Sequence, residues 1–155
     1  MQYNAEIAGW FIPDLEEHGI DIEKDFDYVE QVVGLVKELV SFVKELWDQS
    51  FFFYQAPTSY DEKVVKKRWK EESPAQMAEL SDVINGISDF SAHNQEEIIK
   101  GWIEQKGYHL GNVMNAFRLA IVGESKGPHM FDITATIGKE ETVKRLEKAI
   151  QYIKL

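Results

Sequence analysis

The last third of the chain, Lys106–Ile150, reads KGYHLGNVMNAFRLAIVGESKGPHMFDITATIGKEETVKRLEKAI. Its apolar residues recur at helical spacing, and glycines at 123 and 138 interrupt the pattern where helices would end. The pattern predicts helices from about Gly111 to Val122, over Met130–Ile137 and over Glu140–Ile153. Helices joined by short glycine turns are typical of a helical bundle.

The rest of the chain shows the same periodicity, and no strand alternation extends beyond a few residues. Further helices are predicted over Ala5–His18, Tyr28–Trp47, Tyr60–Lys70, Pro74–Ser88 and Gln95–Lys106. We therefore expect an all-α fold made of two small helical subdomains packed end-on. The predicted boundary at Glu71–Pro74 gives subdomains of residues 1–72 and 73–155. Trp10 and Trp47 are expected in the first core, and Trp102 in the second.

Charge is distributed unevenly along the chain. The 155 residues carry a net charge of −10. Residues 1–57 hold 3 basic and 12 acidic side chains, whereas residues 106–155 hold 8 basic and 5 acidic ones. Within the middle part, Thr58–Lys70 holds 5 basic and 2 acidic residues. Such asymmetry indicates an end that faces a polyanion, although a solvated charged face would give the same pattern.

Several classes of site are not expected. The chain has no cysteine, and its four histidines stand singly, so neither a disulfide framework nor a metal site is predicted. No phosphate-binding glycine loop or nucleophile signature is present, and no carboxylate lies in an apolar context that would raise its pKa. The apolar runs are too short to span a bilayer, and no signal peptide is evident. These features predict an intracellular, non-catalytic domain.

Arg118 is the most informative single residue, because it interrupts the apolar helix segment NAFRLAIVG. A guanidinium in that position must emerge at an edge or find a partner. One alternative is an ion pair with a carboxylate. The other is a contact with an RNA base or phosphate, to which the planar fork can make two bonds. Lys148, by contrast, is expected to be an ordinary lysine on the exposed side of the last helix.

The segment after that helix is the second candidate, and it comprises Lys126, Gly127, Pro128, Met130 and Phe131. A glycine allows a ligand to approach the backbone, and the first amides of a helix can bind an anion. Exposed aromatic and methionine side chains can stack on unpaired bases. Burial as a hydrophobic staple is the alternative, and it is expected for Phe131 rather than for Met130.

The string GxVMxxxRLAxVGxSKGPxxFxI, followed by GKEETxxRLEKA, resembles the C-terminal end of bacterial glutamyl-tRNA synthetase, in its anticodon-binding region. YDEKVVKKRWKEES (Tyr60–Ser73) and SFFFY (Ser50–Tyr54) are similar to that family as well. The resemblance covers essentially the whole chain. The HIGH-like and KMSKS-like signatures of this class I synthetase are absent, so the chain is expected to be a non-catalytic fragment of a glutamate–tRNA ligase.

The resemblance implies an anticodon-binding helical bundle, also described as an α-helical cage. It implies that Arg118 and the Lys126–Phe131 loop lie against anticodon bases. It also implies a position in the long central helix where discriminating relatives carry an arginine; here the string is Lys37–Glu38–Leu39–Val40. Leu39 cannot donate a hydrogen bond, so base discrimination at that position is not expected from its side chain.

The function implied by the resemblance is recognition of the anticodon stem-loop of a glutamate tRNA during protein synthesis. The cofactors ATP and Mg²⁺ are expected only in the parent enzyme, outside this chain. A cytoplasmic monomer with no DNA or membrane partner is expected. The alternatives are a free-standing helical module whose basic end binds a protein, and a small helical enzyme that uses carboxylates and His109.

Overall fold

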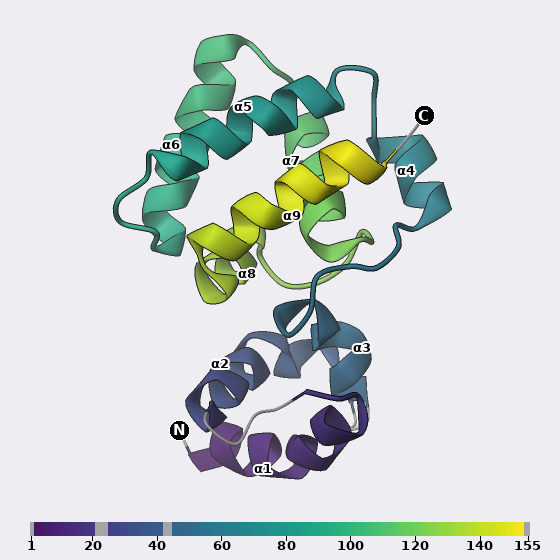
Figure 1. The fold of residues 1–155 in the computed structure, drawn as a ribbon. Coiled ribbons are helices and arrows are strands. Elements are labelled where there is room, and N and C mark those ends of the chain that lie inside the picture. The colour runs from purple at the N-terminus through teal and green to yellow at the C-terminus, as the bar shows by residue number, and fades with distance from the viewer. Residues whose placement is uncertain (1, 21–24, 42–44, 154–155) are drawn as a thin grey trace. The chain divides into compact units, whose positions relative to one another are not determined.

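The chain folds into helices joined by short loops, as a computed structural model that describes residues 2–20, 25–41 and 45–153 shows (Figure 1). Within these residues there is no strand, so the predicted all-α fold is confirmed. Nor does any helix there have the length and hydropathy that crossing a membrane requires. The chain forms two compact units, residues 1–55 (unit 1) and residues 56–155 (unit 2).

The two units divide earlier in the chain than the boundary expected at Glu71–Pro74. Residues 56–72 belong to unit 2 because they contact its later helices. The Asp61 amide donates a hydrogen bond to the Gly123 carbonyl at 2.9 Å. The Lys148 ammonium donates one to the Pro57 carbonyl, also at 2.9 Å. Because these contacts join residues far apart in the sequence, no local pattern of turn residues marks the boundary between the two units.

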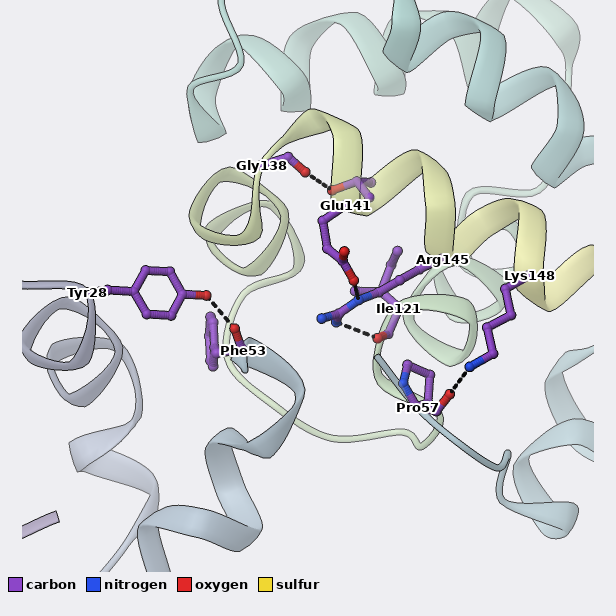
Figure 2. A network of polar contacts seen from close by, with 9 residues as sticks. Tyr28, Phe53, Pro57, Ile121, Gly138, Glu141, Arg145 and Lys148 are labelled. Carbon is purple, nitrogen blue, oxygen red and sulfur yellow. Dashed lines mark hydrogen bonds and ion pairs between the residues drawn. The ribbon is translucent and has the colours of Figure 1, made fainter. Parts of the chain in front are cut away.

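In its described residues, unit 1 contains two main helices and three short ones: α1 (Gln2–Glu17), α2 (Phe26–Val36), η1 (Lys37–Leu39), α3 (Leu46–Ser50) and η3 (Phe51–Phe53). Its core includes Phe11 and Leu15 of α1 and four valines of α2. At Gly34 the two helices approach closely, because a Cβ atom there would lie 3.1 Å from Asn4 Nδ2. The Tyr28 hydroxyl donates to the Phe53 carbonyl and ties α2 to η3 (Figure 2).

The long helix predicted over Tyr28–Trp47 is wrong. The α-helix ends at Val36, η1 follows, and Val40 is extended with φ −127° and ψ 148°. Glu38, Leu39 and Ser41, which follow the α-helix, are exposed, so little burial there supports its continuation. Residues 42–44 of the predicted helix lie outside the described residues.

The expected burial of three tryptophans is also corrected. Trp10 is 59% exposed, and Trp47 and Trp102 are partly exposed. In α1 the buried face runs through Ile7, Phe11 and Leu15, at a spacing of four residues, and Trp10 lies off that line. The buried tryptophan is Trp69, which directly follows α4 in an extended conformation.

Unit 2 contains six helices in its described residues: α4 (Glu62–Arg68), α5 (Ser73–Asn85), α6 (Ala92–Lys106), α7 (Leu110–Val122), α8 (Met130–Ile137) and α9 (Lys139–Tyr152). The C-terminal helix α9 packs against α5, α7 and α8, and α4 packs against α7 (Figure 1). The α7 helix contributes the largest share of the core, with Val113, Ala116, Phe117, Leu119, Ala120, Ile121 and Val122 all buried.

The position of α8 is fixed by a buried polar contact as well as by apolar packing. The Thr134 hydroxyl donates to Gln95 Oε1 of α6 at 2.6 Å. The Gln95 amide in turn donates to the Phe90 carbonyl at 2.9 Å. Both side chains are fully buried, so each needs the other as a hydrogen-bond partner. This pair ties the middle of α8 to α6.

Candidate nucleic-acid interface

The candidate interface begins at the C-terminal end of α7. Phe117 and Leu119 face the core, which places Arg118 between them at the edge of the helix, half-buried. The helix ends at Gly123, whose φ of 85° is in the left-handed region. A Cβ atom at this position would lie 2.7 Å from Pro57 Cβ and 2.9 Å from the Ser59 carbonyl oxygen. Only glycine therefore fits at this turn.

The Arg118 guanidinium is anchored by one hydrogen bond. Its Nη1 donates to the Lys126 carbonyl at 3.0 Å. Burial lowers the pKa of the Arg118 guanidinium, which nevertheless remains charged at neutral pH. Among the described residues no carboxylate forms an ion pair with it. The ion-pair alternative is thus not found, and the other N–H groups of the fork remain available.

The loop between α7 and α8 presents one further cation. The Lys126 ammonium lies 3.4 Å from the Glu124 carboxylate, and both side chains are partly exposed. Gly127 has a φ of 108°, a conformation that side-chain-bearing residues rarely adopt. The loop therefore turns sharply between Lys126, whose carbonyl Arg118 holds, and Pro128, which leads into α8.

Met130 and Phe131 both lie in the core, with exposed fractions of 3% and 1%. The expected burial of Phe131 is confirmed, and the expectation that Met130 is exposed is wrong. Both residues stand in the first turn of α8, which Thr134 holds against α6, and this directs their side chains inward. Neither side chain can stack on a base in this conformation. Their backbone amides, in the first turn of a helix, lack intrahelical partners.

The remaining candidate, Leu39, belongs to unit 1. It ends η1 and is 47% exposed. The structure thus brings Arg118, Lys126, Gly127, Pro128, Met130 and Phe131 into one segment of unit 2, whereas Leu39 belongs to the other unit.

Arg145 is a structural residue that no sequence motif marks. Its side chain is buried; Nε donates to the Glu141 carboxylate at 2.7 Å and Nη1 donates to the Ile121 carbonyl at 3.0 Å (Figure 2). It thereby satisfies a backbone group in the last turn of α7, next to the candidate loop. The i, i+4 spacing of Glu141 and Arg145 is the one signal that could have indicated this pair.

Lys148 is not the ordinary surface lysine that its helix position predicts. It is half-buried, and its bond to the Pro57 carbonyl joins α9 to the segment before α4 (Figure 2). Lys144, one turn earlier in α9, is exposed and has no side-chain partner among the described residues. Lys144 is therefore the better control for the effect of removing a positive charge.

The described residues contain no group of three or more histidine, aspartate or glutamate side chains that could hold a metal ion. His129 is the residue before α8, and its ring lies 5.6 Å from that of Phe131. His109 caps α7 by accepting a hydrogen bond from the Asn112 amide at 3.1 Å. His109 thus has a structural role at a helix end.

Comparison with known proteins identifies the family. A family model described as an anticodon binding domain matches residues 5–150. A glutamate–tRNA ligase of Phocaeicola vulgatus is 59% identical over 151 residues, which are 97% of this chain and 30% of that protein. A glutamate–tRNA ligase of Bacteroides thetaiotaomicron is 57% identical over 154 residues, or 99% of this chain and 30% of that protein.

Solved structures agree with these matches. A glutamate tRNA ligase from Elizabethkingia meningosepticum, in complex with its amino acid, superposes with a TM-score of 0.88 at 39% identity, and covers 97% of this chain. A glutamate–tRNA synthetase from Elizabethkingia anophelis gives a TM-score of 0.81 at 38% identity. The chain spans about 30% of the length of the curated relatives it matches. The chain belongs to the anticodon-binding domain family, in the form found in glutamate–tRNA ligases.

Proposed function

We propose that the chain recognises the anticodon stem-loop of a glutamate tRNA for a glutamate–tRNA ligase. In that enzyme, ATP-dependent joining of glutamate to tRNA would take place on residues outside this chain, where ATP and Mg²⁺ would bind. The chain itself contributes binding and no chemistry, and it acts in the cytoplasm as a monomer. Membership of the anticodon-binding domain family supports this assignment.

The observation that carries the proposal is the state of Arg118. Its guanidinium is half-buried and charged, and it uses one N–H on the Lys126 carbonyl. A charged group at the edge of a core without a carboxylate partner is costly unless a ligand completes its bonding. Unpaired bases and phosphates offer acceptors that match the planar fork. An RNA loop is therefore the ligand that best fits this side chain.

The neighbouring residues have distinct roles in the proposal. Lys126 supplies a second positive charge, and Gly127 allows the RNA backbone or a base to approach the chain closely. Pro128 restricts the loop before α8. Met130 and Phe131 anchor the loop through their buried side chains, and their backbone amides at the start of α8 can donate hydrogen bonds to the ligand.

Leu39 would contribute differently from these residues. Its exposed side chain can make an apolar contact with a base, but it has no donor with which to read a base edge. We propose that Leu39 of unit 1 adds apolar contact area, while residues of unit 2 make the hydrogen bonds to the anticodon bases. A protein-interaction module is the second candidate because one end of the chain is basic, and the family match favours tRNA over it.

Equilibrium binding of the purified chain to a glutamate tRNA, measured against the same tRNA with an exchanged anticodon, tests the proposal. Preference for the native anticodon, with affinity that falls as salt rises, is expected. Equal binding of both tRNAs at every salt concentration would contradict anticodon recognition. Failure to bind either one would contradict RNA binding altogether.

A further inference from the structure

Helix α4 carries a row of exposed lysines. Lys63, Lys66 and Lys67 are spaced three and four residues apart, which places them on one face of the helix. All three are exposed, whereas Val64 and Val65 are half-buried. Lys70 follows the helix and is exposed as well. We call Lys63, Lys66, Lys67 and Lys70 the α4 lysine row.

The row is distinguished by its lack of partners. None of its four lysines forms an ion pair or a side-chain hydrogen bond among the described residues. Elsewhere in the described part of unit 2, most cations have a partner: Lys100 with Glu96, Lys106 with Glu79, Arg118 with Lys126, Lys126 with Glu124, Lys139 with Asn85, Arg145 with Glu141 and Lys148 with Pro57. Unpaired positive charge is therefore concentrated on α4, although the chain as a whole is strongly acidic.

Helix α4 is also fixed relative to the candidate interface. The Asp61 carboxylate caps the helix by accepting from the Lys63 and Val64 amides, at 2.9 and 3.1 Å. The Asp61 amide donates to the Gly123 carbonyl, at the residue where the α7–α8 loop begins. Helix α4 packs against α7, which carries Arg118 (Figure 1). The lysine row and the Arg118 loop thus belong to one packed structure.

We infer that the α4 lysine row binds the phosphate backbone of the tRNA's double-stranded anticodon stem while the Arg118 loop holds the unpaired bases. This inference rests on the proposed function. Lysine ammonium groups are compact charges that bind phosphates without reading sequence. Acidic residues 61, 62, 71 and 72 flank the row at both ends, which confines the positive surface to the helix.

The test compares two triple variants with the same change in net charge. Lys63→Gln/Lys66→Gln/Lys67→Gln removes the row, and Lys100→Gln/Lys106→Gln/Lys144→Gln removes three exposed lysines from other helices. For three phosphate contacts, the slope of log affinity against log salt should become shallower by about 2–3 units in the first variant. The slope of the control should change by less than one unit. The preference for the native anticodon should be retained in both.

Three further measurements sharpen the result. Replacing the same three residues with arginine should restore the wild-type slope, because the charge is kept. The glutamine variant should lose affinity for the isolated anticodon stem-loop and keep its affinity for the single-stranded loop oligonucleotide. Thermal melts should match wild type, since the described part of the chain offers the row no intramolecular partner.

An unchanged salt slope in the glutamine variant would overturn the inference, and so would an equal loss of affinity for stem-loop and loop alone. A variant that binds RNA normally but no longer binds an acidic protein would also overturn it, and would assign the row to a protein partner. These outcomes differ from failure of the proposed function, in which the wild-type chain itself would not distinguish the two anticodons.

Discussion

The Arg118 guanidinium donates to the Lys126 carbonyl at 3.0 Å, which links the last turns of α7 to the loop that precedes α8. The same bond orients the planar fork and shapes the loop beside it. A ligand that binds the remaining N–H groups would meet an arginine already held in one position. Such preorganisation lowers the entropy cost of binding.

Arg118→Ala should weaken binding of the native glutamate tRNA by about 1–3 kcal/mol, and binding of an anticodon-exchanged tRNA much less. Arg118→Lys should recover only part of the loss, because an ammonium lacks the two-pronged fork. Lys144→Ala is the control and should weaken both tRNAs equally and slightly. Competition binding at fixed salt measures these differences.

Thermal melts must accompany that assay, because Arg118→Ala also removes the bond to Lys126. Because no carboxylate among the described residues is left unpaired by the change, the variant should lose only about 0.5–1.5 kcal/mol of stability. A variant that melts near wild type and binds both tRNAs as wild type does would remove Arg118 from the interface.

The purified chain should not activate glutamate. The basis is the lack of nucleotide-binding and nucleophile signatures in its sequence. Glutamate-dependent exchange between ATP and pyrophosphate is the appropriate assay, with a heat-denatured sample as control. Exchange above that control would show that the chain carries chemistry of its own.

Arg145→Ala should destabilise unit 2 by about 2–3 kcal/mol, because it leaves the Ile121 carbonyl and the Glu141 carboxylate without their charged donor. The loss should appear as a lower midpoint of urea unfolding with an unchanged slope. Lys144→Ala, on the same helix, should leave the midpoint within error. Equal midpoints for both variants would contradict a structural role for Arg145.

Gly123→Ala and Gly107→Ala form a matched pair, because both glycines have left-handed φ angles and end a helix. At Gly107 a Cβ atom would meet nothing within 4 Å, so the expected cost is the backbone strain of about 1–2 kcal/mol. At Gly123 the Cβ atom would also collide with Pro57 and Ser59, which raises the expected cost to about 2–4 kcal/mol. Chemical denaturation of both variants should show the difference.

Tyr108→Phe should lower stability at neutral pH but not in acid. The hydrogen bond from Tyr108 at 2.5 Å, and then the Lys106 ammonium, hold the pKa of Glu79 below its ordinary value of about 4.5. A lowered folded-state pKa contributes stability above pH 4.5 that is lost as the pH falls through the folded pKa. The melting temperatures of variant and wild type should therefore converge as the pH falls from 4.5 through the folded-state pKa of Glu79.

The matched control for Tyr108 is Tyr152→Phe, because Tyr152 is 62% exposed and has no partner among the described residues. Its melting temperature should follow wild type at every pH. A pH-independent difference for Tyr108→Phe would show that the ring packing, and not the bond to Glu79, is responsible.

The sequence was informative wherever structure depends on local chemistry. The apolar stripes and stop glycines of α7, α8 and α9 predict helices that the structure contains, within a few residues. The central helix was predicted too long, because the valine stripe continues past Val36 while the backbone does not. Periodicity reports which residues could lie on one face, and it does not report where tertiary packing stops supporting a helix.

The amino-acid sequence by itself determined the all-α class, the family and the segment that carries the candidate loop. Only the tertiary structure decided which side chains in that segment are available. It buried Met130 and showed that Lys148 is bonded to Pro57. Among the residues that the structure describes, it left Arg118 without a carboxylate partner and the α4 lysines without side-chain bonds. The physical reason is that burial and pairing depend on residues distant in sequence. A helical spacing places a side chain on a face, and the elements packed against that face decide what it contacts.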